Sequence, residues 1–421
     1  MKQAILEKME YLVKEYLSLK AKEEQTQELS VGVGFPDFTE KETMAALKSI
    51  LELNISQGKM VKEFEGMFSK FVGTKYGAAV NSGTSANLLA LTALLESGDL
   101  KKGDEVIIPA STFQTVASPI LQVGLVPVFV DVQQSSYNID PKEARKAISP
   151  KTKLLMPVHS LGNPCEMKQI LEIAKEKNLK VLEDCCEAHA SKIGSKVVGS
   201  FGDLASISFF VAHNMTTGEG GMIFYSDDKF DEIIRSLREF GRINQSIGRF
   251  DYSDKFLGHY DKRYVFTRLG YNFRMTDIAA SIGIEQLKKI NDITEKRVNN
   301  VLFYNKKLKE FEDYLLLPEI RPNTTHTFYT YPLTVKENAS FSRQEIVDFL
   351  EENKIETRPF FSGCIPDQPA MQGKPQRIVG DLQVSRYIKY NTFFIGCHQK
   401  LGKKETSFVV EKMAEFMQKN A

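Results

Sequence analysis

The sequence predicts an α/β protein with a mostly parallel central sheet, helices on both faces of that sheet, and a smaller C-terminal α+β domain. Between residues 74 and 227, short apolar β-rich runs alternate with helix-like stretches. Strands that are apolar on both faces and separated by helices are typical of a parallel sheet covered by two helical layers. The chain has 421 residues, which is too long for one small core and indicates a second domain.

The predicted strands of the sheet are "DEVIIPA", "VPVFVDV", "KLLMPV", "KVLEDC", "ASISFF" and "GMIFYS", with helical patterns such as "EMKQILEIAKEKNL" between most of them. In such a sheet, ligands bind beyond the carboxyl ends of the strands. The polar residues at those ends are therefore candidates for a site. They are Ser111–Phe113, His159, Asp184 and Ser208.

The chain is expected to divide into an N-terminal amphipathic helix (1–30), a large ligand-binding domain (31–290) and a small C-terminal domain (291–421). Apolar residues at i, i+3 and i+4 spacing predict the first helix, whose apolar face should pack on the protein itself or on a sister subunit. A long helical pattern over 276–308 is expected to lead into the small domain. In that domain, "TFYTYPLTV" is strand-like and "SRQEIVDFLEEN" is helix-like.

Composition narrows the class of protein. The formal net charge of +1 gives no reason to expect nucleic acid as a partner, and no apolar run is long enough to span a membrane. The N-terminus is interrupted by charges and is not typical of a signal peptide. The five cysteines form no CxxC pair, which favours unligated structural cysteines in a reducing cytoplasm over a disulfide framework, a metal site or an iron–sulfur cluster.

Two stretches could bind the phosphate and ring of a ligand. "NSGTSANLLALTALL" is a small-residue turn that opens a helix, and the backbone amides near Gly83, Thr84 and Ser85 could hold a phosphate. The alternative is a plain capped helix. Phe113 follows a strand and could stack on a flat ring, although a lone aromatic residue is more often part of a core.

Two further stretches carry groups that could do chemistry. Asp184 ends an apolar strand, with Glu187 three residues on, and a buried carboxylate needs a cationic partner such as a protonated heterocyclic nitrogen. The alternative is an Asp that caps the next turn. Ser208 ends another strand, where its hydroxyl could reach a phosphate, and His213 follows before the glycine-rich "TTGEGG". A lone histidine is usually structural.

Taken together in this order, the motifs resemble those of the fold type I pyridoxal-phosphate enzymes, and most closely the sugar aminotransferase family that acts on nucleotide-linked keto sugars. "NSGTSAN", "GDEVIIPASTF", "EDCCEAH", "SFFVAHNMTTGEGGM" and "LGYNFRMTDIAA" carry the resemblance. It implies that Asp184 pairs with the ring nitrogen, that Phe113 stacks on the ring and that Glu187 lies near the ring hydroxyl. Gly83, Thr84, Ser85 and Ser208 would hold the phosphate. Asn272 would reach it from a neighbouring subunit, so a homodimer with a shared site is implied.

The sequence departs from the aminotransferases at His213, because those enzymes carry a lysine there that tethers the cofactor covalently. An imidazole cannot form that link but can move protons near neutral pH. The substitution resembles the 3-dehydratases of nucleotide-linked 4-keto-6-deoxyhexoses. It implies a non-covalently held pyridoxamine phosphate, loss of the C3 hydroxyl of the sugar with His213 as acid and base, and glutamate as the donor that restores the amine.

Three alternatives remain open. One is the iron–sulfur-dependent dehydratase, although "INQSIGRFDYSDKFLGHYDKRYVFTR" lacks the cysteines that precede the "LGYN" motif in that kind. Another is a nucleotide-sugar aminotransferase that uses a different lysine, and the third is a cofactor-binding sensor without turnover. The resemblance also suggests substrate contacts for which structural roles are equally expected. These residues are His159, Asn163, Arg274, Arg358 and His398.

Overall fold

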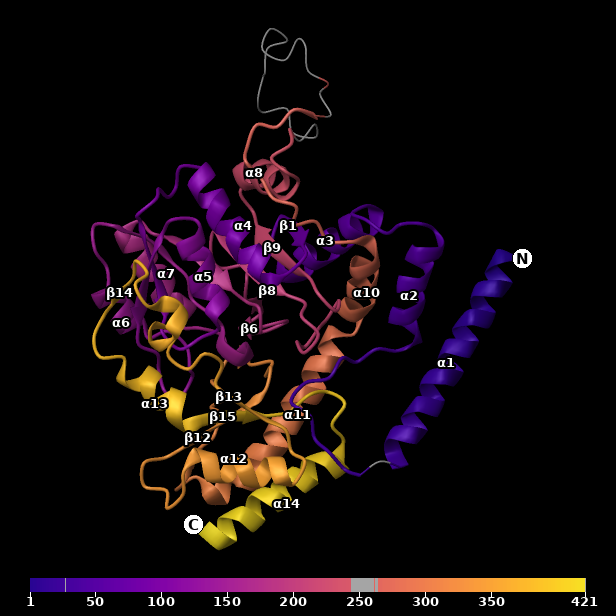
Figure 1. Cartoon of the computed structure of the whole chain (residues 1–421), viewed down its shortest axis with the longest axis vertical. Helices are drawn as coiled ribbons and strands as arrows, with labels where there is room; N and C mark the ends of the chain where they lie inside the picture. Colours follow the sequence, from indigo (N-terminus) through magenta and orange to yellow (C-terminus); the bar gives the residue numbers. More distant parts are fainter. Residues whose placement is uncertain (27, 244–260, 262–263, 421) are drawn as a thin grey trace.

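The central element of the molecule is a sheet of eight strands (Figure 1). The structure is a computed structural model that describes residues 1–26, 28–243, 261 and 264–420. Its strand order is β1-β9-β8-β5-β4-β2-β3-β14. The strands are β1 (Tyr76–Val80), β2 (Glu105–Pro109), β3 (Val126–Val130), β4 (Thr152–Leu155), β5 (Lys180–Asp184), β8 (Leu204–Ser208), β9 (Gly221–Tyr225) and β14 (Arg377–Ile378).

The sheet is mostly parallel, as predicted. Neighbouring strands from β8 to β14 pair in parallel, whereas β9 pairs antiparallel with both β8 and β1. The described loop 209–220 between β8 and β9 contains no crossover helix, and a parallel pair would need one. The predicted strand "KLLMPV" is shorter than expected, and β1 was not among the predicted strands because its "YGAAV" has few β-branched residues.

Helices cover both faces of the sheet, which confirms the predicted layers. One face packs against α4 (Gly83–Glu96), α5 (Gln114–Gln122) and α8 (Asp228–Arg238) through one continuous core. The opposite face packs against α3 (Lys59–Val72) and α10 (Asp277–Lys288), and further along the sheet against α6 (Pro141–Lys146) and α7 (Met167–Lys177). Short strands β6 (Lys192–Ile193), β7 (Lys196–Val197) and β11 (Thr324–Thr325) form a separate small sheet.

A second sheet with its own core forms below the first (Figure 1). Its strand order is β10-β12-β15-β13, and all pairs are antiparallel. The strands are β10 (Leu315–Leu316), β12 (Tyr331–Val335), β13 (Thr357–Pro359) and β15 (Thr392–Ile395), and the helices with them are α11 (Ile290–Leu308), α12 (Arg343–Glu352), α13 (Gln383–Asn391) and α14 (Lys403–Asn420).

Two segments cross the boundaries proposed from the sequence. Val31 pairs with Ile355 and belongs to the core of the small sheet, whereas β14 from the C-terminal region extends the large sheet. The helix expected over 276–308 is two helices, because the backbone leaves helical geometry at Lys289. There, α10 packs on α2 (Glu40–Leu51) and α3, while α11 packs on α14. The domain limits themselves stay a prediction.

The N-terminal helix α1 (Lys2–Thr26) lies at the edge of the molecule beside α2 (Figure 1). Its apolar side is only partly covered, and several of its large apolar side chains are exposed. Within the described part of the chain, no helix has the length and apolarity needed to cross a membrane.

Candidate active site

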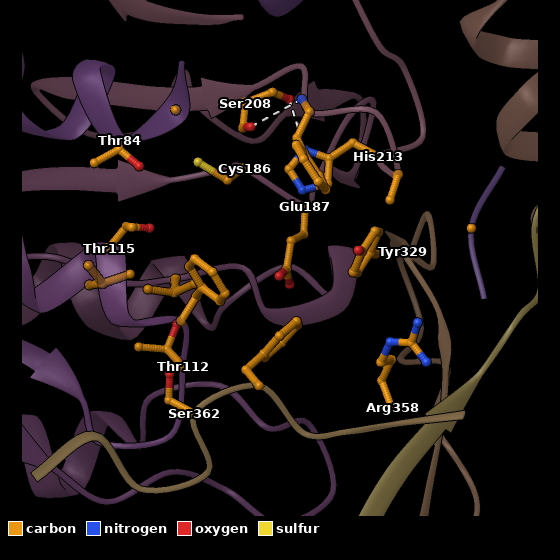
Figure 2. A pocket seen from close by; sticks show the side chains of 18 of the residues that line it. Thr84, Thr112, Thr115, Cys186, Glu187, Ser208, His213, Tyr329, Arg358 and Ser362 are labelled. Atoms are coloured by element: carbon orange, nitrogen blue, oxygen red, sulfur yellow. Dashed lines mark hydrogen bonds between the residues drawn. The ribbon is translucent and has the colours of Figure 1, made fainter. Parts of the chain in front are cut away.

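A cavity of about 960 Å³ lies where the large sheet faces the small one. The carboxyl ends of β5 and β8 and the start of α4 form one side, and β13 with the loop after it forms the other. Figure 2 shows Thr84 and Thr115 at one end of this cavity and Tyr329 and Arg358 at the other. The predicted site residues on its wall are Gly83, Thr84, Phe113, Asp184, Glu187, Ser208, His213 and Arg358.

The start of α4 forms the end of the cavity that best suits a phosphate. The hydroxyl of Ser82 accepts the amide hydrogen of Ser85 at 3.1 Å and caps the helix. The amides of Gly83 and Thr84 belong to the first turn, which has no carbonyl acceptors within the helix. A Cβ on Gly83 would lie 2.6 Å from the Cβ of Ser208. Only glycine therefore lets the start of α4 lie this close to the end of β8. A small anion fits the resulting cradle, because free amides and the helix dipole favour negative charge.

Asp184 is held in a fixed orientation at the end of β5. One carboxylate oxygen accepts a hydrogen bond from the side chain of Asn87 at 2.8 Å, and the other accepts the amide of Cys186 at 3.0 Å. Asn87 in turn accepts the hydroxyl of Ser206 at 2.6 Å. Asp184 is 3% exposed, and its carboxylate lies in the cavity wall with an amide side chain and a backbone amide, and no cationic side chain, as the hydrogen-bond partners found in the described chain. It can therefore pair with a protonated ring nitrogen of a bound ligand.

His213 projects into the cavity from the turn that follows β8. Its Nδ1 lies 3.1 Å from the carbonyl oxygen of Ser208. Because a carbonyl only accepts hydrogen bonds, Nδ1 carries the proton and Nε2 keeps a lone pair. Burial lowers the pKa of His213 to about 4, so the ring is neutral at physiological pH. Tyr329 packs edge-on against it, with 5.2 Å between ring centroids. The geometry provides a neutral base that is fixed in one tautomer.

No lysine is found among the described residues that line this cavity. The resemblance to the aminotransferases implies a tethering lysine at position 213, and this chain places the imidazole of His213 there. The acidic and cationic side chains of the lining are instead Asp184, Glu187, Glu219, Glu356 and Arg358.

Glu187 points into the middle of the cavity (Figure 2). Its Oε2 accepts the amide hydrogen of Leu161 at 2.6 Å. Burial, together with the negative charge of Asp184, raises the pKa of Glu187 to about 8. The carboxyl group is therefore protonated at neutral pH and can donate a hydrogen bond to a ligand.

Aromatic rings from both halves of the molecule meet across the cavity. Phe113, which is 52% exposed, contacts Phe361 edge-on at 6.2 Å between centroids, and Phe361 is stacked with Tyr329 at 6.4 Å. Phe361 has a φ of 42°, a left-handed conformation that is uncommon for a bulky residue. Arg358 lies on the same side and forms an ion pair with Glu356. An exposed Phe113 suits a stacking role better than the core role that the sequence left open.

Three predicted substrate residues lie away from the cavity wall. His159 is fully buried, with Nε2 3.1 Å from Glu183 and Nδ1 accepting the amide of Cys165 at 2.9 Å. Asn163 is buried and donates to the carbonyl of Ser136, and His398 is buried beside Phe35. For all three, the contacts favour the structural role that the sequence had left open.

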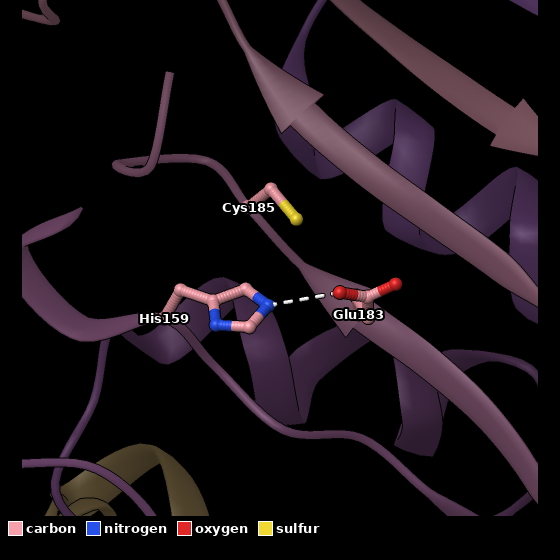
Figure 3. A group of neighbouring side chains, drawn as sticks. All are labelled: His159, Glu183 and Cys185. Carbon is pink, nitrogen blue, oxygen red and sulfur yellow. Dashed lines mark hydrogen bonds and ion pairs between the residues drawn. The ribbon is translucent and has the colours of Figure 1, made fainter. Parts of the chain in front are cut away.

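His159, Glu183 and Cys185 form the group of side chains in the described chain that comes closest to a metal site (Figure 3). The lone pair on Nδ1 of His159 already accepts the amide of Cys165, so the proton is on Nε2, facing Glu183. Glu183 also accepts the amides of Gly199, Phe201 and Gly202. These bonds occupy the imidazole and the carboxylate that a metal would need, so the cluster is better explained as a buried hydrogen-bond network that supports the end of β5.

The remaining predicted residues are Ser85, Asn272 and Arg274. Ser85 lies behind the cavity wall, where its amide and hydroxyl both bond to Ser82. Asn272 is exposed and accepts a hydrogen bond from Arg274 at 3.1 Å. Neither Asn272 nor Arg274 lines the cavity of its own chain. Their predicted roles in the site of a second subunit stay predictions.

Sequence reasoning missed several residues of the site. Asn87 lies inside the quoted "NSGTSANLLALTALL", one turn after the phosphate turn, and an amide on an apolar helix face was the available signal. Tyr329 lies two residues before β12, where nothing distinguished it from a core aromatic residue. Other missed wall residues include Thr115, Cys186, Glu219, Glu356, Phe361 and Ser362.

Comparison with known families finds one match that spans most of the chain. Residues 37–414 match the family model described as the DegT/DnrJ/EryC1/StrS aminotransferase family. Among curated proteins, the dTDP-4-dehydro-2,6-dideoxy-D-glucose 3-dehydratase of Saccharopolyspora spinosa is 37% identical over 395 residues, covering 91% of this chain and 85% of that protein.

Two solved structures share the architecture. A GDP-4-keto-6-deoxymannose-3-dehydratase with a trapped PLP-glutamate geminal diamine has a TM-score of 0.85 and 28% identity, covering 91% of this chain and 99% of its own. An aminotransferase from Psychrobacter cryohalolentis also has a TM-score of 0.85 and 28% identity, covering 92% and 98%. Both the fold type and the resemblance inferred from the motifs are thereby confirmed. The chain belongs to the DegT/DnrJ/EryC1/StrS aminotransferase family, as a pyridoxal-phosphate enzyme of the nucleotide-sugar dehydratase or aminotransferase kind.

Proposed function

We propose that this protein removes the C3 hydroxyl of a nucleotide-linked 4-keto-6-deoxyhexose, with pyridoxamine phosphate as cofactor and glutamate as the amino donor that restores it. The observation that carries the proposal is the neutral His213, with a free lone pair on Nε2, in a cavity whose described wall contains no lysine. A site with this composition can move protons but has no amine with which to tether the cofactor.

The residues present fit the cofactor. The phosphate suits the cradle formed by Gly83, Thr84 and Ser208, where an added Cβ would leave no room. The ring nitrogen suits the carboxylate of Asp184, and the ring face suits the exposed Phe113. When bound, the cofactor supplies an amine for the sugar ketone and an electron-withdrawing ring that weakens the neighbouring C–H and C–O bonds.

His213 would act as base first and as acid afterwards. With a pKa near 4 the imidazole is neutral, so Nε2 can accept a proton from carbon. The bond from Nδ1 to the Ser208 carbonyl fixes the ring while this happens and stabilises the imidazolium that forms. The protonated ring can then donate to the departing C3 hydroxyl, which leaves as water. One side chain thus serves both ends of the elimination.

A protonated Glu187 supports the same course. Because Oε2 accepts the amide hydrogen of Leu161, the proton is available on the other oxygen of this cavity-lining side chain. A neutral carboxyl group can donate to a ring hydroxyl or a substrate oxygen without adding a second charge beside Asp184.

The charge of the cavity supports a site shared between two subunits. Arg358 is the one cationic side chain among its described lining residues, beside four carboxyl groups. A cofactor phosphate and a nucleotide diphosphate need more cationic or amide donors than that. Asn272 and Arg274 lie outside their own cavity, where they could reach a second copy.

An inter-subunit complementation assay tests the shared site. His213→Asn and Arg274→Ala should each be nearly inactive, because each removes one half of the site. A heterodimer of the two contains one intact site, so mixing them with subunit exchange should restore about one quarter of wild-type activity. If the mixture stays inactive while heterodimers are present, Arg274 acts in its own chain or not at all.

The decisive test of the reaction is a panel of GDP-, CDP- and dTDP-linked 4-keto-6-deoxyhexoses, each supplied with pyridoxal phosphate and glutamate. A 3-dehydratase yields a product that has lost the C3 oxygen by mass, with release of ammonia. An aminotransferase yields an aminosugar that keeps this oxygen, and a sensor yields no product. Either of the last two outcomes refutes the proposal.

Iron content of the same preparation tests the iron–sulfur alternative. Cys165, Cys185, Cys364 and Cys397 are buried and unpaired, and the cysteine-free segment cited above lies mostly outside the described residues. We expect turnover in protein that contains no iron; turnover that requires an iron–sulfur cluster would contradict this.

A further inference from the structure

Helix α1 carries two apolar stripes, and only one of them is covered. Leu6, Val13 and Leu17 are partly buried on the side that packs on α2. Ile5, Leu12, Tyr16 and Leu19 are between 51% and 66% exposed. Helix α1 lies beside α2 at the edge of the molecule (Figure 1), so one stripe holds it to the body of the protein while the second apolar stripe is exposed.

The exposed stripe has the spacing of a coiled-coil seam. Together with the half-buried Met9, its residues follow each other at intervals of four and three, and we call this set the outer seam: Ile5, Met9, Leu12, Tyr16 and Leu19. Alternating steps of three and four place residues on one line of contact between two helices. At a rise of 1.5 Å per residue, the outer seam is about 21 Å long.

The charges beside the outer seam complement a second copy of the same helix. Lys8 and Glu15 lie on its open flank, and both are exposed. When two such helices run antiparallel about a two-fold axis near residues 10 and 11, Lys8 of each faces Glu15 of the other. The two-fold axis makes two such ion pairs, each between a lysine and a glutamate, and they flank the apolar contacts symmetrically.

We propose that the outer seam of α1 binds the outer seam of a second copy of this chain, antiparallel, as an interface separate from the active site. An isologous contact of this kind closes after two copies, so it links molecules in pairs rather than into fibres. If the enzyme is already a dimer through its active sites, this contact makes a dimer of dimers.

Cysteine cross-linking of the full-length, cofactor-loaded protein tests the contact directly. In Lys8→Cys/Glu15→Cys, oxidation should join two chains covalently, because residues 8 and 15 of one helix are too far apart to pair with each other. The matched control is Lys14→Cys/Ala21→Cys, whose positions lie on the opposite face and should stay unlinked. Equal linking in both proteins, or none in either, overturns the proposal.

Charge reversal gives the second readout. Lys8→Glu should weaken self-association by roughly tenfold in sedimentation velocity, because two ion pairs become repulsive contacts. Adding Glu15→Lys in the same chain should restore it, whereas Lys14→Glu should leave it unchanged. Failure of the double variant to recover would mean that Lys8 and Glu15 do not face each other.

Discussion

The two sides of the cavity are built in different ways. On the large-domain side, Asp184 is bonded to Asn87 and Cys186, Asn87 is bonded to Ser206, and all but Cys186 are buried. On the small-domain side, Arg358 is exposed and forms an ion pair with the half-buried Glu356, whose carboxylate also accepts the amide hydrogen of Val33 at 2.8 Å. The first side is fixed before any ligand arrives, whereas the second can adjust when one does.

This difference indicates which part of the ligand each side serves. The cofactor is the constant part of the reaction and needs a rigid, preorganised cradle. The sugar nucleotide must enter and leave in each cycle, which suits an open side with exposed charges. Phe361 joins the two sides through ring contacts with Phe113 and Tyr329, and its left-handed backbone is the strain expected where such a side closes over a ligand.

The largest effect is expected at His213, on the fixed side. His213→Asn should lower turnover by about 10²–10⁴-fold, because an amide cannot accept a proton at neutral pH. Cofactor binding should persist, since no charge is removed from the cradle, and absorbance titration with pyridoxal phosphate checks this. Unchanged turnover would show that His213 is not the base.

His213→Lys should convert the same position into a covalent anchor. We expect borohydride to fix pyridoxal phosphate to residue 213 of the variant and to leave the wild type unlabelled, as read by peptide mass. Elimination of the C3 hydroxyl should be lost in parallel. A wild-type protein that is labelled at any lysine would contradict a non-covalently held cofactor.

The next largest effect is expected on cofactor affinity, where a matched pair of variants compares the two sides of the cavity. Asp184→Asn removes a charged partner of the ring nitrogen and should weaken cofactor binding by about 1.5–3 kcal/mol, roughly 10–100-fold. Glu356→Gln makes the same chemical change on the open side and should change cofactor affinity by less than about threefold. Fluorescence titration with pyridoxal phosphate measures both. Equal losses of cofactor affinity in the two variants would mean that the cofactor is not bound mainly by the large-domain side.

The fixed side is also the side that the sequence predicted well. The α/β layers and most strands of the large sheet followed from apolar runs that end in polar residues, and those polar ends include Asp184 and Ser208. These signals are local, because strand, turn and helix start lie within a few residues of one another. The local signal left His213 as a structural histidine, and only the resemblance to the family predicted its place in the site.

The open side was predicted poorly for a physical reason. Its residues come from separate segments, such as Tyr329 before β12 and Phe361 after β13, and only the folded chain brings them together. The buried roles of His159 and His398 were likewise undecided in the sequence, since a histidine in a core and one in a cavity have the same neighbours along the chain. The direction of β9 and the break at Lys289 depend on packing partners that periodicity does not report.

A smaller effect is expected from closing the gap between α4 and β8. Gly83→Ala places a Cβ 2.6 Å from that of Ser208, so the helix start must shift, at a cost of about 1–3 kcal/mol in the free energy of unfolding. Affinity for the cofactor phosphate should fall with it. The control is Gly66→Ala at an exposed position of α3, where an added Cβ meets nothing within 4 Å and should stabilise by up to about 1 kcal/mol. Urea denaturation measures both, and equal stability of the two variants would refute a tight cradle.

The smallest effect at neutral pH is expected for Glu187→Gln, although its effect on the pH profile is specific. In the wild type, kcat/KM should fall on the acid side as His213, with a pKa near 4, gains a proton, and on the basic side as Glu187, with a pKa near 8, loses one. A glutamine donates the same hydrogen bond at every pH, so the variant should keep its activity at pH 7 and lose the basic limb. His213 would be unaffected, and the acid limb should stay where it is. If the basic limb persists in Glu187→Gln, another group causes it. The protonated carboxyl of Glu187 would then not be the hydrogen-bond donor that activity requires.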